Sequence, residues 1–196
     1  MADAALPIPH RRADIMGMPL SLPLPRYTIA DLAQFPADGQ RYELLEGFLL
    51  VTPAPGGPHQ VIASRLQVVL GVYLGQRAYV TGPGVIERQP NTHLEPDLLV
   101  FPGPITRNFR WRDLTAHWLA VEVFSRSSRK YDRDYKRDAY LALGLPEVWL
   151  VDRWERVVFV CRPKEPERRV TGTLRWQPPG METGFSLEVE QLLVDL

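Results

Sequence analysis

Residues 118–124 of the chain have the sequence Trp-Leu-Ala-Val-Glu-Val-Phe, an apolar run with a single acid, Glu122. Short, nearly continuous apolar runs are typical of strands that are buried on both faces of a mixed or parallel sheet. Two further runs of this kind lie on either side of it, at residues 97–101 and 147–151. An ionised carboxylate in a buried strand is costly unless it is paired or binds a metal. This stretch therefore predicts a sheet and a candidate functional site within it.

The distribution of proline locates the helices around these strands. Segments 59–82 and 105–145 contain no proline, and long helices are expected there because an interior proline costs a helix about 3 kcal/mol. In the first segment, apolar side chains recur at helical spacing: Ile62, Leu66, Val69 and Tyr73. In the second, the expected apolar stripe is Tyr131, Tyr135, Ala139, Ala142 and Leu143, beside a face with Asp132, Lys136 and Tyr140.

The remaining strands are expected in pairs. Residues 41–45 and 48–52 flank a Glu-Gly turn and predict a β-hairpin. Residues 156–162 and 168–176 predict a later antiparallel pair. The order of hairpin, helix, strands, helix and strand predicts one α/β domain.

Length and composition limit the classes of protein to consider. The 196 residues suit one domain, expected over 26–196, and five prolines in residues 1–25 predict a flexible arm. The 23 basic and 23 acidic residues balance, which argues against coating nucleic acid by bulk charge but not against a local basic groove. No apolar run approaches the roughly 20 residues of a membrane span. The single cysteine, Cys161, excludes a disulfide framework within one chain, and we expect a cytoplasmic protein.

A second acid, Asp97, begins the run at residues 97–101. If the two acidic strands are neighbours, Asp97 and Glu122 would together offer oxygen ligands to Mg²⁺ or Mn²⁺. The alternative is that each acid lies at a strand end, where it is solvated or paired with an arginine.

A basic segment follows Glu122. Residues 126–137 contain six basic and two acidic side chains, a local charge of +4 in a neutral chain. Four of them are expected to bind phosphate: Arg126, Arg129, Lys130 and Arg133. The alternative is a solvated helix face on which Asp132 and Lys136 form an ordinary pair four residues apart. Lys136 is one of only three lysines, and its compact ammonium can contact a phosphate or, if desolvated, handle a proton.

Taken in order, these residues resemble the PD-(D/E)XK nuclease superfamily and, more narrowly, the Uma family of putative restriction endonucleases, a former domain of unknown function. The resemblance covers residues 26–196. Its landmarks are residues 42–47, His59-Gln60, Glu95-Pro96-Asp97, residues 121–125, the series Asp132, Lys136 and Tyr140, and residues 148–152. It implies a restriction endonuclease-like core of helix, three strands, helix and strand, with a mixed sheet flanked by helices and an N-terminal β-hairpin. One departure is that Phe124 takes the strand position of the superfamily's usual lysine, so the resemblance nominates Lys136 on the following helix.

The resemblance implies a metal-dependent endonuclease, an Mg²⁺-dependent endodeoxyribonuclease that hydrolyses DNA phosphodiester bonds. The residues it nominates are Asp97, Glu122, Lys136 and Glu43, with Mg²⁺ (or Mn²⁺) held by Asp97, Glu122 and the backbone carbonyl of Val123, and His59, Asp132 and Tyr140 in support. The partner would be DNA, with no membrane, and a homodimer is compatible with cutting both strands. The alternative is a catalytically inactive module of the same fold that binds nucleic acid or a protein.

Overall fold

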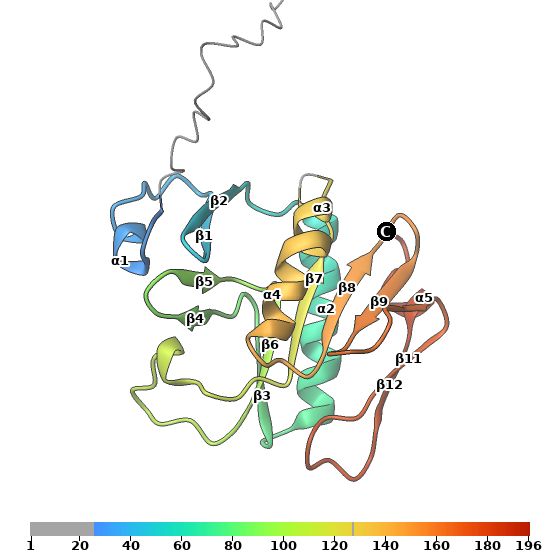
Figure 1. Ribbon diagram of the computed structural model, residues 1–196. Helices are drawn as coiled ribbons and strands as arrows, with labels where there is room; N and C mark the ends of the chain where they lie inside the picture. The colour runs from blue at the N-terminus through green and yellow to red at the C-terminus, as the bar shows by residue number, and fades with distance from the viewer. Residues whose placement is uncertain (1–25, 127) are drawn as a thin grey trace, which may run out of the picture.

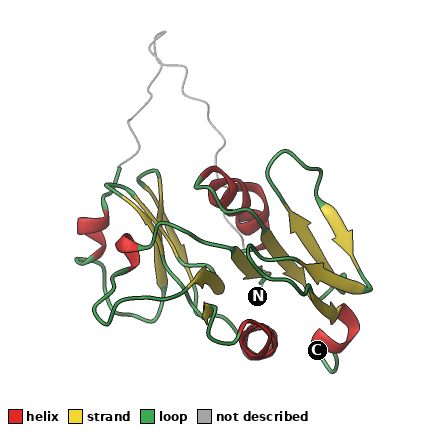
Figure 2. Ribbon diagram, turned by 90° about the horizontal axis from the view of Figure 1, so that it is seen from below, coloured by secondary structure: helices red, strands yellow, loops and turns green. Residues whose placement is uncertain are grey.

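The computed structural model describes residues 26–126 and 128–196, so the arm expected at residues 1–25 lies outside it. A six-stranded sheet forms the centre of the molecule, with one helical layer on each face and a smaller four-stranded sheet beside it (Figures 1 and 2). The order of the large sheet is β10 (Arg168–Val170), β9 (Val157–Cys161), β8 (Val148–Asp152), β7 (Leu119–Val123), β6 (Leu98–Pro102) and β3 (Ala78–Thr81). The order of the small sheet is β2 (Phe48–Thr52), β1 (Arg41–Leu45), β5 (Thr92–Leu94) and β4 (Ile86–Arg88).

The two acidic strands are neighbours at the centre of the large sheet. Strand β7 runs parallel to β8 and antiparallel to β6, so the sheet is mixed. Leu98 pairs with Val121, and one step further along this register brings Asp97 opposite Glu122. All five residues of β7 and of β8 are buried, which confirms the prediction of strands covered on both faces.

The helix α2 (Gly57–Leu74) covers one face of the sheet and begins with Pro58 in its first turn, as predicted. It packs Ile62 and Leu66 against Val121 and its alternate neighbours in β7. The other face of β7, which includes Ala120, packs against Tyr140 of the opposite helix. By the alternation of a strand, Glu122 also points toward that second helix.

The second helical segment is continuous but irregular. It consists of α3 (Arg129–Tyr131), a π-helical turn (Asp132–Lys136) and α4 (Arg137–Ala142). The predicted apolar stripe was wrong: Tyr135 is 53% exposed, whereas Asp132, Lys136 and Tyr140 are buried. The reason is that these polar side chains have partners beneath them, described below, which make their burial possible.

The C-terminal region also differs from the prediction. The expected strand at 168–176 is broken at Thr171-Gly172. Strand β10 pairs with β9 as expected, but β11 (Thr173–Trp176) pairs with β12 (Phe185–Glu188) in a separate two-stranded sheet. The short helices are α1 (Ile29–Leu32), the 3₁₀ turn η1 (Trp111–Asp113) and α5 (Val189–Leu192). Across the described residues, no helix has both the length and the hydropathy that a membrane span requires.

Candidate functional site

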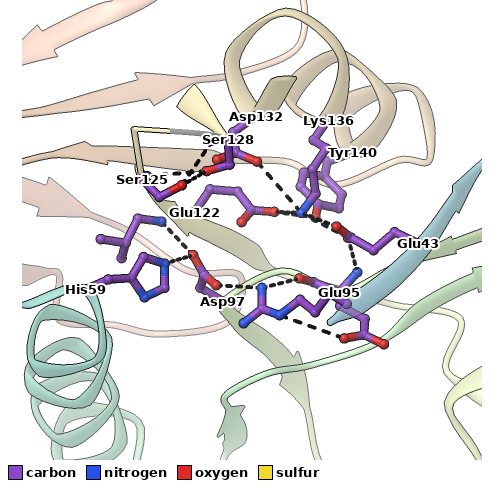
Figure 3. Close-up of polar contacts among 12 residues, drawn as sticks. Glu43, His59, Glu95, Asp97, Glu122, Ser125, Ser128, Asp132, Lys136 and Tyr140 are labelled. Carbon is purple, nitrogen blue, oxygen red and sulfur yellow. Dashed lines mark hydrogen bonds and ion pairs between the residues drawn. The ribbon is translucent and has the colours of Figure 1, made fainter. Parts of the chain in front are cut away.

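A polar cavity of about 170 Å³ lies where the two sheets meet the helical segments. Its walls come from β1 and β2, the link to α2, the ends of β6 and β7, and the π-helical turn. The charged and histidine side chains that line it are Arg41, His59, Asp97, Glu122, Asp132 and Lys136. Figure 3 labels all of these except Arg41 and shows the labelled side chains pointing toward one another from separate elements.

Asp97 immediately precedes β6 and is held by three partners. Its Oδ1 accepts a hydrogen bond from Arg41 Nη1 at 2.9 Å, and its Oδ2 lies 2.8 Å from His59 Nε2. The backbone N–H of Val123 also donates to Oδ2 at 2.8 Å. Burial raises the pKa of Asp97, but His59, Arg41 and this N–H group outweigh burial and lower it to about 2. Asp97 is therefore a carboxylate at neutral pH.

Lys136 lies at the centre of the remaining acids and is 2% exposed. Its Nζ is 2.7 Å from Glu122 Oε1, 2.9 Å from Glu43 Oε1 and 3.9 Å from Asp132 Oδ1. Burial lowers the pKa of Lys136, but the three carboxylates, Glu122 foremost, raise it well above its ordinary value. The ammonium is therefore a permanent cation in this environment.

Glu122 accepts a second hydrogen bond at Oε1, from the Tyr140 hydroxyl at 2.6 Å. No hydrogen bond from a described residue reaches its other oxygen, Oε2. Burial raises the pKa of Glu122 well above its ordinary value, against the effect of Lys136 and with the help of the neighbouring acids. Burial likewise raises the pKa of Asp132 to about 6. The surroundings of Glu122 and Asp132 thus contain too little positive charge to stabilise both as ionised carboxylates.

Acidic side chains predominate in the site. Four acids (Asp97, Glu122, Glu43 and Asp132) surround two permanent cations (Lys136 and Arg41), so the acids outnumber these cations by two, and the raised pKa values of Glu122 and Asp132 reflect this crowding. Carboxylate oxygens are the ligands that Mg²⁺ and Mn²⁺ prefer, so the donor chemistry fits such a cation. Among the described residues, no three acid, histidine or cysteine side chains are arranged as a metal cage, because cationic and hydrogen-bonding partners hold these acids instead.

The four side chains predicted to bind phosphate fall into two classes. Arg129 pairs with Asp152 at 2.7 Å and with Glu155, and Arg133 pairs with Glu167. Arg126 and Lys130 are exposed, and neither forms an ion pair with a described residue. Phosphate binding stays a prediction for all four, and among them only Arg126 and Lys130 have a charge that no acid of the described chain pairs.

Sequence reasoning did not nominate Arg41 for the site and gave Glu95 only as a landmark of the resemblance. Arg41 lies two residues before Glu43 on β1, so strand alternation puts both side chains on one face, a signal that the sequence did contain. The N–H of Glu95 donates to Glu43 Oε1 at 2.7 Å, and the Glu95 carboxylate lies 4.0 Å from Arg41 Nε. Nothing in the sequence indicates that these distant residues meet.

Comparison with known proteins adds two findings. A family model, Uma2, described as a putative restriction endonuclease, matches residues 29–190. The fold is similar to the crystal structure of a putative nuclease of the DUF820 group from Anabaena variabilis, with a TM-score of 0.72 and 21% identity, over 85% of this chain and 97% of that one. None of the curated proteins matches the chain.

Proposed function

The chain belongs to the Uma2 family of putative restriction endonucleases, and from this premise we propose that its polar cavity hydrolyses DNA phosphodiester bonds with Mg²⁺ or Mn²⁺. One observation carries the proposal. Two acids at the ends of adjacent strands, Asp97 and Glu122, and the ammonium of Lys136 reach a single cavity in which acidic side chains outnumber the lysine and arginine side chains. Restriction endonuclease-like chemistry needs acids and a cation in such proximity to a phosphate.

Asp97 and Glu122 would hold the divalent cation, with the backbone carbonyl of Val123 as a further ligand. When bound, such a cation lowers the pKa of a coordinated water and offsets charge on the phosphate. Glu122 offers Oε2, which no described residue bonds, while Tyr140 and Lys136 orient the carboxylate through Oε1. Tyr140 and Lys136 are thus positioning groups for Glu122.

Lys136 would act through its charge. Because the surrounding acids raise its pKa, the ammonium stays protonated and can orient the attacking water or contact the scissile phosphate, but does not accept a proton. Glu43 holds the ammonium from the hairpin at 2.9 Å. Asp132 lies farther away, at 3.9 Å, and adjusts the local charge.

Arg41 is the partner of Asp97 that can leave it most readily. The Val123 N–H belongs to the backbone and the His59 side chain is 10% exposed, whereas the Arg41 side chain is 20% exposed and has Glu95 4.0 Å away as an alternative partner. We expect Arg41 to move toward Glu95 or a substrate phosphate when a cation reaches Asp97. A guanidinium suits both partners because it binds carboxylates and phosphates alike.

Nicking of supercoiled plasmid DNA in Mg²⁺ or Mn²⁺ tests the proposal. Asp97→Asn and Glu122→Gln are each expected to lower the rate at least a hundredfold, because each keeps the side-chain shape but removes an anionic ligand. Asp134→Asn and Glu190→Gln, which change exposed acids, are matched controls expected to keep the wild-type rate. Calorimetric titration with Mn²⁺ gives a second readout, in which Asp97→Asn should abolish binding. Nicking that persists in Asp97→Asn would refute the assignment of the site.

A second candidate is a module of the same fold that binds nucleic acid or a protein without cleaving it. One observation favours it: Asp97 and Lys136 already have close partners, as in a purely structural ion-pair network. Plasmid that stays intact in both metals, with salt-sensitive DNA binding, would support this candidate over hydrolysis. A homodimer and a cytoplasmic location stay predictions under either candidate.

A further inference from the structure

A basic groove lies apart from the polar cavity, at the junction of β10 with the β11–β12 pair. Its volume is about 420 Å³, and three arginines line it: Arg162, Arg168 and Arg175. We call it the β10–β12 groove. The hydroxyl-bearing Ser186 is exposed beside them. The groove thus combines cationic and neutral hydrogen-bond donors in one concave surface.

Arg162 is held in place from behind. Its Nε donates to Glu147 Oε2 at 2.7 Å, and the buried Glu147 accepts a further bond from Trp149 Nε1 at 2.6 Å. These bonds fix the plane of the guanidinium through Nε, and its Nη1 lies 3.7 Å from Glu165 Oε2. The charge of Arg162 is therefore balanced by acids of its own chain. A guanidinium oriented in advance loses less side-chain entropy when it binds an anion.

The other two arginines carry unpaired charge. Arg168 and Arg175 are exposed, and neither forms an ion pair with a described residue. They come from different sheets, since Arg168 pairs with Val160 in the large sheet and Arg175 with Ser186 in the small pair. The neighbouring Arg169, by contrast, lies 3.7 Å from Glu155. The groove therefore carries two positive charges that no described residue pairs, those of Arg168 and Arg175.

The floor of the groove is apolar and closed. Trp176 and Phe185 face each other across β11–β12 and pack on Trp149, with centroid distances of 5.7 and 6.2 Å. They are 3% and 6% exposed, so their rings are not available to stack on bases. A ligand in the groove meets guanidinium and hydroxyl groups, which suits phosphates rather than bases.

The groove is a separate site from the polar cavity. In the sheet register, Glu122 lies beside Leu150 and Leu150 beside Phe159, while Arg162 follows three residues later. The backbones of Glu122 and Arg162 are therefore about 10 Å apart in the direction of the strands and about 10 Å apart across the sheet, which is two strand spacings. Alternation along β9 also directs Arg162 toward the face that α2 covers, opposite the face of Glu122.

From these observations we propose that the β10–β12 groove binds the sugar-phosphate backbone of DNA at a point remote from the polar cavity. Two unpaired arginines, Arg168 and Arg175, beside the oriented guanidinium of Arg162 and without a stacking platform, are complementary to neighbouring phosphates and carry no sequence preference. The inference rests on the proposed function only for the choice of DNA among polyanions. Binding in the groove needs neither a metal ion nor cleavage.

The test is fluorescence anisotropy of a labelled 20-base-pair duplex with the full chain in EDTA, over a series of salt concentrations. Replacing both unpaired arginines (Arg168→Gln with Arg175→Gln) should weaken binding at low salt about tenfold or more. It should also reduce the slope of log K against log salt by about 2, close to 1 for each lost phosphate contact. Each single variant should reduce the slope by about 1, and far-UV circular dichroism should show that all three variants fold.

The matched control replaces Arg77 and Arg107 with glutamine. Both are exposed, neither forms an ion pair with a described residue, and their loss changes the net charge equally. An equal loss of affinity in the control pair, or an unchanged slope in the groove pair, would overturn the inference. Binding of labelled polyglutamate as tight as that of DNA would overturn the choice of nucleic acid. Groove-dependent binding without nicking would support this inference and refute hydrolysis, and nicking without groove dependence would do the reverse.

Discussion

Lys136 shows how a single buried cation can organise a site. A buried ammonium is costly on its own, and so is each of the carboxylates of Glu122 and Glu43. Together they form contacts of 2.7 and 2.9 Å in a region where water is almost excluded. Removal of one member therefore leaves the others as uncompensated buried charges. The stability of the fold should report on this pairing independently of any catalysis.

We predict that Lys136→Met destabilises the protein by about 3–5 kcal/mol, because two buried acids lose their counter-ion while the side-chain volume is kept. Urea unfolding at pH 7 measures this change. The control is Lys130→Met on the same helical segment, where the lysine is exposed and the expected change is within about 0.5 kcal/mol. Equal stabilities of the two variants would show that the ion pairs contribute little to folding.

Asp132 predicts a dependence of stability on pH. Burial raises its pKa from 3.8 to about 6, so between these values the folded state binds more protons than the unfolded state. The stabilisation that this extra proton gives the folded state is fully present below pH 3.8 and is lost as the pH rises through 6. The loss amounts to about 3 kcal/mol, at 1.36 kcal/mol for each unit of the pKa shift. In urea unfolding, the free energy of unfolding of Asp132→Asn should therefore rise by about that much relative to the wild type between pH 4 and pH 7. A constant difference between the two proteins across this range would contradict the prediction.

The residues of the site were predictable in part. Two acids at corresponding ends of adjacent buried strands could be inferred from the sequence, and the register places Asp97 and Glu122 side by side. The two alternatives for Asp97, a site acid or an acid paired with an arginine, turn out to be compatible, because Arg41 bonds it inside the cavity. The sequence could not show this pairing, since 56 residues separate the partners and no local pattern links them.

At the scale of elements, the helical segment after β7 was the least predictable. Hydrophobic periodicity favours a buried Tyr131–Tyr135 face, but the π-helical turn and the acids beneath it bury the polar series instead. The Arg137 N–H donates to the carbonyl of Asp132 in the five-residue spacing of a π-turn. Periodicity measures the affinity of side chains for an apolar core, so it fails where the buried surface is charged.

The strands were more predictable, because their apolar runs and turn residues are local signals. The predicted hairpin boundaries match β1 and β2. Two residues with positive φ, Glu46 at 50° and Gly47 at 85°, connect these strands in the manner of a type I′ turn. Four short strands, β3, β4, β5 and β12, were not predicted, because strands of three or four residues carry too little periodicity to detect.

This turn gives a prediction for the hairpin that carries Arg41 and Glu43. A non-glycine residue with positive φ is strained, and asparagine tolerates that conformation better than glutamate. Glu46→Asn should therefore stabilise the protein by about 0.5–1 kcal/mol, as measured by urea unfolding. Gly47→Ala should destabilise it by a similar amount or more, since a Cβ there would lie 3.2 Å from the Tyr27 carbonyl. Stabilisation by both substitutions would contradict the turn assignment.

For the molecule as a whole, the site depends on long-range assembly. The side chains around the polar cavity come from both sheets, from α2 and from the π-helical turn, so no isolated segment contains it (Figure 3). The similarity to a solved nuclease-like fold at 21% identity extends over most of the chain. The fold therefore supplies the scaffold, and the charges on it decide the chemistry.

The predicted homodimer has a candidate surface on α2. Three valines on this helix are exposed, Val61 at 41%, Val68 at 64% and Val72 at 81%. Arg65, the one formally charged residue of the helix, bonds the carbonyls of Leu192 and Val194 within the same chain. The outer face of α2 thus presents three exposed valines beside the neutral polar residues Gln60 and Ser64, and the single cation of the helix is hydrogen-bonded within its own chain. Two copies can bury these valines against each other there.

We predict that this face holds two copies together. Light scattering should give the wild-type chain twice its 22.4 kDa, and Val68→Asp should give a single chain, because the dimer would bury an unpaired charge. The control is Val51→Asp on the hairpin, where a valine of 44% exposure lies away from α2 and the dimer mass should persist. A monomeric wild type would contradict the prediction of a dimer. A dimeric Val68→Asp variant would show that the dimer forms through a face other than that of α2.

If Val68→Asp does halve the mass, plasmid cleavage by this variant should shift from linear toward singly nicked products. The reason is that each DNA strand would then be cut by a separate encounter with a single chain.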